Sequence, residues 1–185
     1  MSDPVGQAVE FWSYRWCAPI AAALAEHDRF STLLSATGIS RNALSRTLVR
    51  LEQLGIMMRN TGYGHPLRPE YALTDYGKTV SVECRALLGQ TGPQTRDIIL
   101  KKWSMPCICA ARPSGSSFTQ LRQILTSITP RALSLTLGDL TESEMIEVKR
   151  SAPRAHPSYH LTENALIYRS SGTAINRAVN QSLYV

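Results

Sequence analysis

Hydrophobic residues recur at intervals of three or four over most of this chain, which is the spacing of amphipathic helices. Helical patterns of this kind cover residues 5–14, 16–25, 30–36 and 41–54. A short strand, a Gly-rich turn and a second strand ending at Leu73 follow. The three helices after residue 15 and the two-stranded hairpin have the order of a winged helix-turn-helix unit.

The whole pattern occurs a second time, 87 to 89 residues later. Trp16 and Pro19 correspond to Trp103 and Pro106. The shared positions continue through the unit: Phe30 with Phe118, Ile39 with Ile128, Leu44, Leu48 and Leu51 with Leu133, Leu137 and Leu140, and Tyr71 with Tyr159. Because an internal repeat determines the architecture, we expect two domains, residues 1–90 and 91–185. The predicted fold class is mainly α with small β-hairpin wings (α+β), as two tandem winged helix-turn-helix domains.

Helix start and stop signals support these boundaries. Gly38 is expected to end the helix over 30–36, and Ser40 is expected to cap the next one. Thr74 is expected to cap a helix that runs to about residue 88, before a break and a helix over 94–102. In the second copy, helices are expected over 103–111, 118–125 and 131–143, a hairpin over 145–161, and a terminal helix from 162. Thr129 followed by Pro130 is a strong start signal.

The polar face of the helix over 41–54 predicts contacts with DNA. In a helix-turn-helix, polar residues early in the recognition helix contact base edges, and cations contact phosphates. Asn42 and Arg46 are the best candidates for bases, since Asn pairs with adenine and Arg with guanine. The predicted DNA-binding residues of this copy are Ser40, Arg41, Asn42, Ser45, Arg46 and Arg50 on the helix, with Arg59 and Arg68 on the wing. The alternative is that this polar face is simply exposed to solvent and does not contact DNA.

The corresponding helix of the second copy is less suited to bases. Arg131 and Ser134 remain as candidates, but the same face carries Asp139 and Glu142, which phosphates repel. An exposed Leu and a mid-helix Gly also lie on this face. The second wing is more basic, with Lys149, Arg150 and Arg154. We therefore expect the second copy to contact mainly the phosphate backbone, with dimerisation or a protein partner as the alternative.

Several segments resemble the HxlR family of bacterial winged-helix transcription regulators. The resemblance covers about residues 12–90, carried by residues 29–33, 39–44, 51–56 and above all 69–77, and more loosely the second copy. The second copy departs from the pattern at Glu144 and Ala165, where the first has Gly. The resemblance implies a regulator that binds operator DNA, usually as a homodimer. Two copies in one chain suggest a pseudo-dimer, although a homodimer of this chain stays open.

Charge favours a DNA partner, and it is uneven along the chain. The formal net charge is +6, made of 9 basic and 8 acidic side chains in residues 1–90 and 11 basic and 6 acidic ones in 91–185. The competing hypothesis is a winged-helix protein-interaction module, such as an antirepressor or a polymerase-binding factor, in which at least the second domain has lost DNA binding.

Other classes of function have little support. The four histidines and four cysteines form no catalytic set and no zinc spacing, so we expect neither an enzyme nor a cofactor or metal. The cysteines lie mostly among apolar residues, which favours packing over redox sensing. No apolar run is long enough to span a membrane, and the N-terminus lacks the features of a signal peptide, so we expect a cytoplasmic protein.

Overall fold

The computed structural model describes residues 4–60, 69–152 and 155–180. The first copy consists of α1 (Pro4–Trp12), α2 (Cys17–Ala23), α3 (Phe30–Thr37), α4 (Arg41–Gln53), β1 (Met57–Asn60), β2 (Glu70–Leu73) and α5 (Asp75–Gly89). The second consists of α6 (Pro93–Ile99), α7 (Ser104–Ala110), β3 (Ser116–Ser117), α8 (Phe118–Ile124), α9 (Pro130–Glu142), β4 (Ile146–Lys149), β5 (Ser158–Leu161) and α10 (Glu163–Asn180). Two winged helix-turn-helix units in tandem are thus confirmed.

The helix ends lie where the local chemistry predicts them. Gly38 ends α3 in the left-handed conformation, with φ 65°. The Ser40 hydroxyl accepts a hydrogen bond from the Ala43 amide at 3.3 Å, and the Thr129 hydroxyl accepts one from Ala132 at 3.2 Å. Each cap satisfies an amide that has no partner within its helix, so both recognition helices begin at a defined residue.

Each wing is an antiparallel hairpin that a third segment extends. β1 pairs with β2 and β4 pairs with β5, each over four residues. In the second copy β3 pairs with β5 through Ser116 and Ser117, a strand that the sequence pattern did not predict. At the matching place in the first copy there is only a single bridge between Arg29 and Glu70. Two residues are too short for a periodic signal, which explains why β3 was missed.

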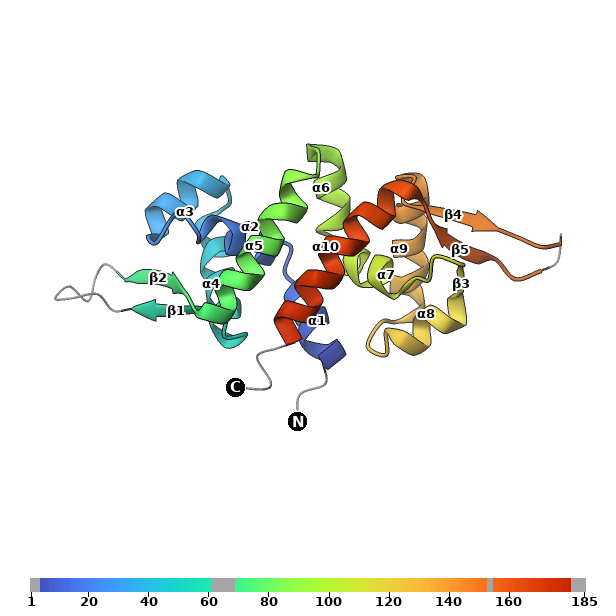
Figure 1. Ribbon diagram of the computed structural model, residues 1–185, viewed down its shortest axis with the longest axis horizontal. Coiled ribbons are helices and arrows are strands. Elements are labelled where there is room, and N and C mark those ends of the chain that lie inside the picture. Colours follow the sequence, from blue (N-terminus) through green and yellow to red (C-terminus); the bar gives the residue numbers. More distant parts are fainter. Residues whose placement is uncertain (1–3, 61–68, 153–154, 181–185) are drawn as a thin grey trace.

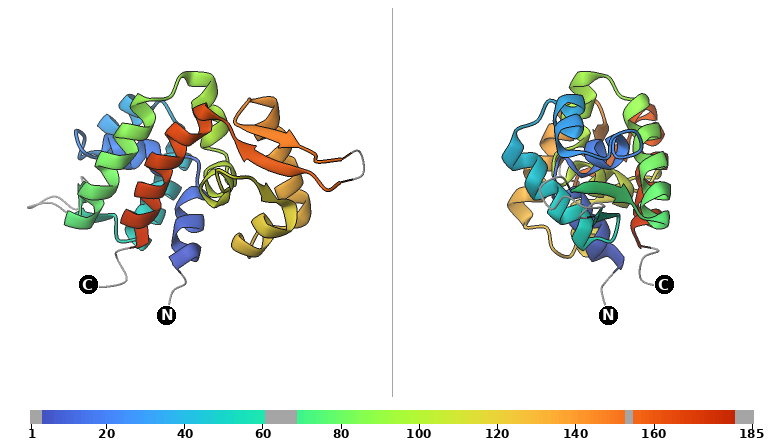
Figure 2. Two further views of the ribbon diagram at one scale, coloured as in Figure 1. Left: turned by 45° about the vertical axis from the view of Figure 1, so that its right-hand side comes forward. Right: turned by 90° about the vertical axis from the view of Figure 1, so that its left-hand side faces the viewer.

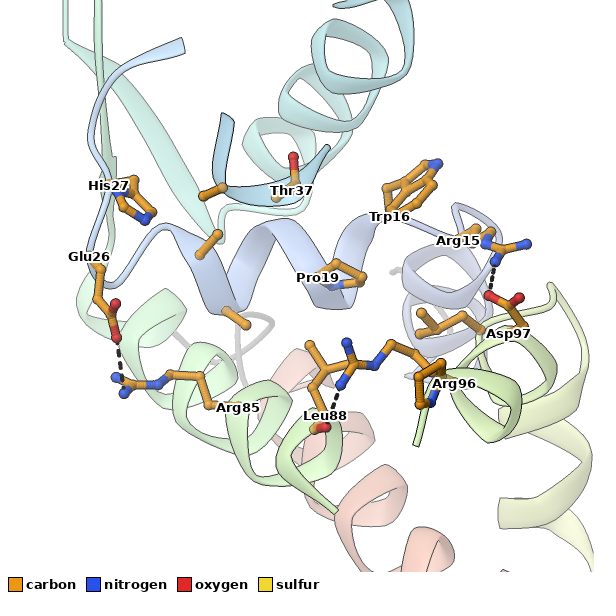
Figure 3. Close-up of a pocket in the computed structure, with 15 residues that line it drawn as sticks. Arg15, Trp16, Pro19, Glu26, His27, Thr37, Arg85, Leu88, Arg96 and Asp97 are labelled. Atoms are coloured by element: carbon orange, nitrogen blue, oxygen red, sulfur yellow. Dashed lines mark hydrogen bonds and ion pairs between the residues drawn. The ribbon is translucent and has the colours of Figure 1, made fainter. Parts of the chain in front are cut away.

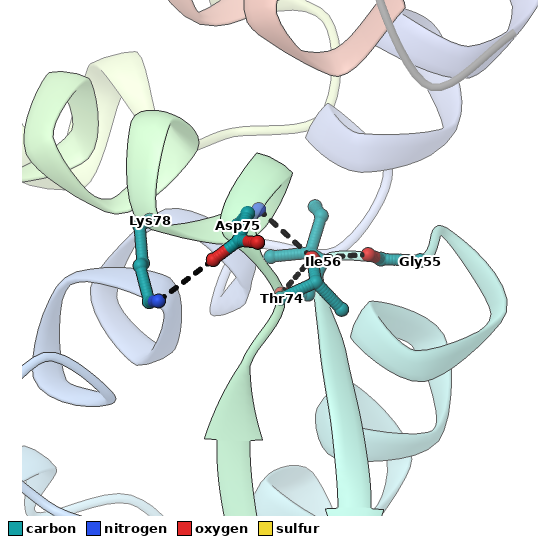
Figure 4. Close-up of polar contacts among 6 residues, drawn as sticks. Gly55, Ile56, Thr74, Asp75 and Lys78 are labelled. Carbon is teal, nitrogen blue, oxygen red and sulfur yellow. Dashed lines mark hydrogen bonds and ion pairs between the residues drawn. The ribbon is translucent and has the colours of Figure 1, made fainter. Parts of the chain in front are cut away.

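The junction between recognition helix, wing and following helix is built alike in both copies. The Thr74 hydroxyl donates to the Gly55 carbonyl at 2.7 Å, and its backbone amide donates to the Ile56 carbonyl at 3.1 Å (Figure 4). A Cβ at Gly77 would lie 1.7 Å from the Ile56 carbonyl oxygen, so this helix start requires Gly. Thr162 makes the corresponding bond to the Glu144 carbonyl at 2.8 Å.

The second copy keeps this junction although it lacks both glycines. Ala165 replaces Gly77 and is fully buried, so the second junction leaves room for one methyl group. Glu144 replaces Gly55 and keeps the left-handed backbone, with φ 58° against φ 69°. A side chain in this conformation costs roughly 1 to 2 kcal/mol, which the surrounding hydrogen bonds must offset.

The two copies pack together through their last helices. α5 and α10 lie side by side in the middle of the molecule, and the two wings point outward at opposite ends (Figure 1). α1 packs against α7 and α10 as well as α2, so the first helix of one copy also covers the other copy. The Trp12 indole donates to the Asn176 side-chain oxygen at 2.7 Å, and the Tyr76 hydroxyl donates to the Val179 carbonyl at 2.8 Å. One continuous core results.

Replacing Glu144 by Gly is expected to stabilise the protein. The substitution removes the strain of a positive φ but adds freedom to the unfolded chain, for a net gain of about 0.5 to 1 kcal/mol. Urea denaturation followed by circular dichroism measures it. Glu142→Gly, in the last turn of α9, is the matched control and should lower the free energy of unfolding, since helical Gly is unfavourable. Equal effects of the two substitutions would contradict the strain argument.

Candidate nucleic-acid interface

The first recognition helix presents a compact polar surface to solvent. Arg41, Asn42, Ser45 and Arg46 are all exposed on α4, while Leu44, Leu48 and Leu51 on its opposite face are buried. Within the part of the chain that the structure describes, neither Arg41 nor Arg46 forms an ion pair. Two uncompensated guanidinium groups thus flank an amide and a hydroxyl, the donor and acceptor set that base edges require.

Ser40 and Arg50, the other two predicted contacts of this helix, are already engaged within the protein. The Ser40 hydroxyl caps α4, as described above. Arg50 turns toward α1: its guanidinium lies 3.1 Å from a Glu10 carboxylate oxygen and 5.5 Å from the centre of the Tyr14 ring. It also donates to the Gln53 side chain at 3.2 Å, and only 20% of its side chain is exposed. Arg50 therefore ties the recognition helix to the preceding helices.

The second copy uses opposite charges at the corresponding place. Asp139 stands 89 residues after Arg50, and Lys101 stands 87 after Tyr14. The Lys101 ammonium donates to the Asp139 carboxylate at 2.7 Å. From the sequence, Asp139 was expected to repel phosphate, but Lys101 compensates its charge. The opposing charge on α9 is therefore smaller than the sequence suggested.

The exposed face of α9 carries fewer cations than that of α4, on which Val49 is also exposed. Arg131, Ser134 and Glu142 are exposed, and 62% of the Leu135 surface is accessible. Val148 on β4 is also exposed, at 39%. A hollow of about 360 Å³ separates α9 from this wing, with Gly138 and Tyr159 among its lining residues. This surface differs in chemistry from that of the first copy, as the sequence comparison predicted.

The wing cations are only partly free. Arg59 on β1 and Arg150 after β4 are exposed, and neither forms an ion pair among the described residues. The Lys149 ammonium lies 3.1 Å from a Glu147 carboxylate oxygen on the same strand, which reduces its contribution. Arg68 and Arg154 lie outside the described residues.

The two recognition helices lie on one side of the molecule. Seen end-on, α5 and α10 occupy one side, and α4 and α9 lie toward the other (Figure 2). This arrangement follows from the pairing of α5 with α10, since each of these helices carries its own winged unit.

The cysteines are packing residues. Burial raises the pKa of Cys17 and of Cys107 to about 12, and it raises that of Cys84 well above its ordinary value. Burial raises the pKa of Cys109 to about 11, although hydrogen bonds from Thr173 and Asn176 oppose the shift. Protonated buried thiols are poor nucleophiles, which agrees with a packing role.

Comparison with known proteins identifies the family. The model of the HxlR-like helix-turn-helix family matches residues 12–91 and again 98–168. The chain belongs to this family. The two matches coincide with the two copies of the repeat, which confirms the resemblance drawn from the sequence. Members of this family are DNA-binding transcription regulators and not enzymes, in agreement with the expectation from the sequence.

A curated relative supports the same assignment. The chain is 38% identical over 77 residues to the uncharacterized HTH-type transcriptional regulator YvaP of Bacillus subtilis (strain 168). The matched segment covers 40% of this chain and 71% of YvaP. The relative is therefore similar in length to one copy of the repeat.

Two further observations concern the described residues of this HxlR-like protein. None of their helices is both long and apolar enough to cross a membrane. No group of three or more His, Cys, Asp or Glu side chains among them is placed to hold a metal ion.

The thiols are expected to resist modification in the folded protein. Because burial raises their pKa values, at pH 8 the thiolate fraction stays far below that of an ordinary thiol, whose value is 9.0. We expect a thiol-reactive disulfide reagent to modify the native protein at least about 100-fold more slowly than the urea-unfolded protein.

The same shifts predict how stability changes with pH. The thiols ionise more readily in the unfolded chain, so the free energy of unfolding should fall as the pH rises above about 9. In the modification experiment, Cys109→Ala is the control, because it removes the cysteine that is the most accessible of the four. Rapid native modification of Cys17 or Cys84 would contradict the packing role.

Proposed function

We propose that the first copy recognises DNA sequence through α4, and that the wings contact the phosphate backbone on either side. The observation that carries this proposal is the cluster of Arg41, Asn42, Ser45 and Arg46. These side chains are exposed, adjacent, and held on a helix whose start Ser40 fixes. A rigid helix with preorganised polar side chains is what direct base contacts require.

The second copy is proposed to add affinity more than sequence specificity. Arg131 near the start of α9 and Arg150 beside the second wing are exposed cations, suited to phosphate contacts. The rest of the α9 face offers few groups that discriminate between bases. Since both units face one side, the chain is proposed to act as a pseudo-dimer on one duplex.

A second candidate function concerns the second copy alone. Two exposed apolar residues, Leu135 on α9 and Val148 in the wall of the hollow between α9 and the wing, favour a contact with another protein. In that case the second copy would add nothing to DNA binding. The salt dependence of DNA binding separates the two possibilities, because each phosphate contact adds to the slope.

Substitutions at Asn42 and Arg46 should reduce sequence discrimination. A duplex selected from a random-sequence library serves as the target, and binding is measured by fluorescence anisotropy at fixed salt. Replacing either residue by Ala is expected to cost about 1 to 3 kcal/mol on the selected duplex and little on scrambled DNA. Ser31→Ala, at an exposed position on α3, is the control. Equal losses on both duplexes would mean that α4 contacts only the backbone.

Replacing Arg150 by Ala should weaken binding to all sequences alike. The slope of log affinity against log salt is expected to decrease by about 1, since one phosphate contact is lost. Arg177→Ala is the matched control, because this exposed cation belongs to α10, a helix that lies on the other side of the molecule from α4 and α9. Unchanged affinity in Arg150→Ala and in Arg131→Ala would favour the protein-interaction role of the second copy.

A further inference from the structure

A cavity of about 490 Å³ lies between α2, α3, α5 and α6 (Figure 3). Part of its wall is apolar, formed by Pro19, Ala22, Ala23, Leu88 and Leu100. Pockets that hold small organic ligands have volumes of roughly 300 to 1,000 Å³ and mostly apolar walls with a few polar groups. The cavity fits this description in size, and its wall combines apolar side chains with a larger share of polar ones.

An aromatic ring borders this cavity. The half-buried Trp16 side chain contributes to the wall, and the Arg15 guanidinium lies 5.5 Å from the centre of its ring. Arg15 is itself bound to Asp97 of α6. Arg15 thus connects the ring to α6, and the ring forms part of the cavity wall.

The charged groups of the wall leave one positive charge uncompensated. Of its three arginines, Arg15 pairs with Asp97, and Arg85 pairs with Glu26 at 3.2 Å. Arg96 forms no ion pair among the described residues. It donates only to neutral oxygens: the Leu88 carbonyl at 2.8 Å, and the Thr91 carbonyl and hydroxyl at 3.3 and 3.4 Å. These bonds orient Arg96 and leave its Nη1 free of protein partners in the described chain.

The shape of the cavity is specific to the first copy. A smaller cavity, of about 180 Å³, occupies the corresponding place in the second copy. There Ile124 and Leu125 line the wall, 88 residues after Ala36 and Thr37 of the larger cavity. Two larger apolar side chains in place of Ala and Thr narrow the space. The scaffold of the repeat therefore does not itself require a cavity of this size.

The chemistry of the cavity is also specific to the first copy. Ala8 and Val9 line the smaller cavity at the positions that Arg96 and Asp97 hold in the larger one, 88 residues later. Thus, the wider cavity also holds the uncompensated arginine, which α6 of the second copy contributes. The two cavities thus differ both in volume and in the presence of an oriented cation. This double difference favours a binding site over a packing defect.

We propose that this cavity binds a planar organic monoanion, such as an aromatic carboxylate. The carboxylate would accept hydrogen bonds from Arg96, since a guanidinium matches the planar geometry of that group. The ring would lie along the apolar wall next to Trp16. A single negative charge would balance the single uncompensated positive charge of the wall.

Binding is tested on the full chain without DNA, so its failure would leave the proposed DNA-binding function untouched. The probes are naphthalene-2-carboxylate and its neutral analogue 2-naphthylmethanol, titrated by calorimetry and by NMR of the tryptophan indole resonances. We expect saturable binding of the carboxylate with one site per chain. The Trp16 resonance, assigned with Trp16→Phe, should shift, whereas those of Trp12 and Trp103 should not. Trp12 borders the smaller cavity and so reports on binding there.

Two variants separate shape from charge. Ala36→Ile introduces the residue that the second copy carries, and both probes should bind at least 10-fold more weakly. Arg96→Gln should weaken binding of the carboxylate at least 10-fold and leave binding of the alcohol unchanged. Unchanged binding of the alcohol would also show that the cavity is still formed. Ser35→Ile, a neighbouring exposed position outside the cavity wall, is the control and should bind both probes normally.

Three results would overturn the proposal. These are the absence of saturable binding by the carboxylate, a shift of the Trp12 resonance in place of Trp16, and equal binding of the carboxylate by the wild-type protein and both cavity variants.

Discussion

The packing of α5 against α10 is the contact on which the rest of the arrangement depends. Each of these helices follows directly from a wing, through the threonine junction that binds it to the end of its own recognition helix. Burying the two helices against each other therefore positions α4 relative to α9. α1 reinforces the contact from the side, since Trp12 of the first copy donates to Asn176 of the second. The orientation of the two winged units is thus a property of the core, where packing is dense and costly to disturb.

Within this arrangement the two copies preserve the scaffold and differ in charge. The recognition helix is anchored to the preceding helices in both, through Arg50 in the first copy and Asp139 in the second. The sign of the anchoring charge is reversed, and its partner changes accordingly. Both copies thus have an ion pair at this position of the recognition helix, although the partners, Glu10 and Lys101, come from positions that do not correspond. What matters for DNA is the net field at the surface, and compensated pairs contribute little to it.

Local features were predictable from sequence, and distant contacts were not. Gly38, Ser40 and the Thr129–Pro130 pair act on amides and carbonyls within a few residues, so the helix boundaries followed from them. Arg50 was placed by periodicity at the border of the exposed face, but its actual partner, Glu10, lies 40 residues earlier. Periodicity gives the direction of a side chain and does not identify the neighbour it meets. The exposed cluster around Asn42 and Arg46 was predictable because no distant segment covers it.

Joining two copies in one chain also removes a constraint that acts on a symmetric dimer. In a two-fold homodimer every contact occurs twice with the same residues, so a substitution must suit both places. Here Trp12 and Asn176 form a hydrogen-bonded pair beside the smaller cavity, while the corresponding positions in the other half hold Leu100 and Leu88, which line the larger one. A homodimer could not have both arrangements. Tandem duplication thus allows the two sides of the central contact to border cavities of different size and chemistry.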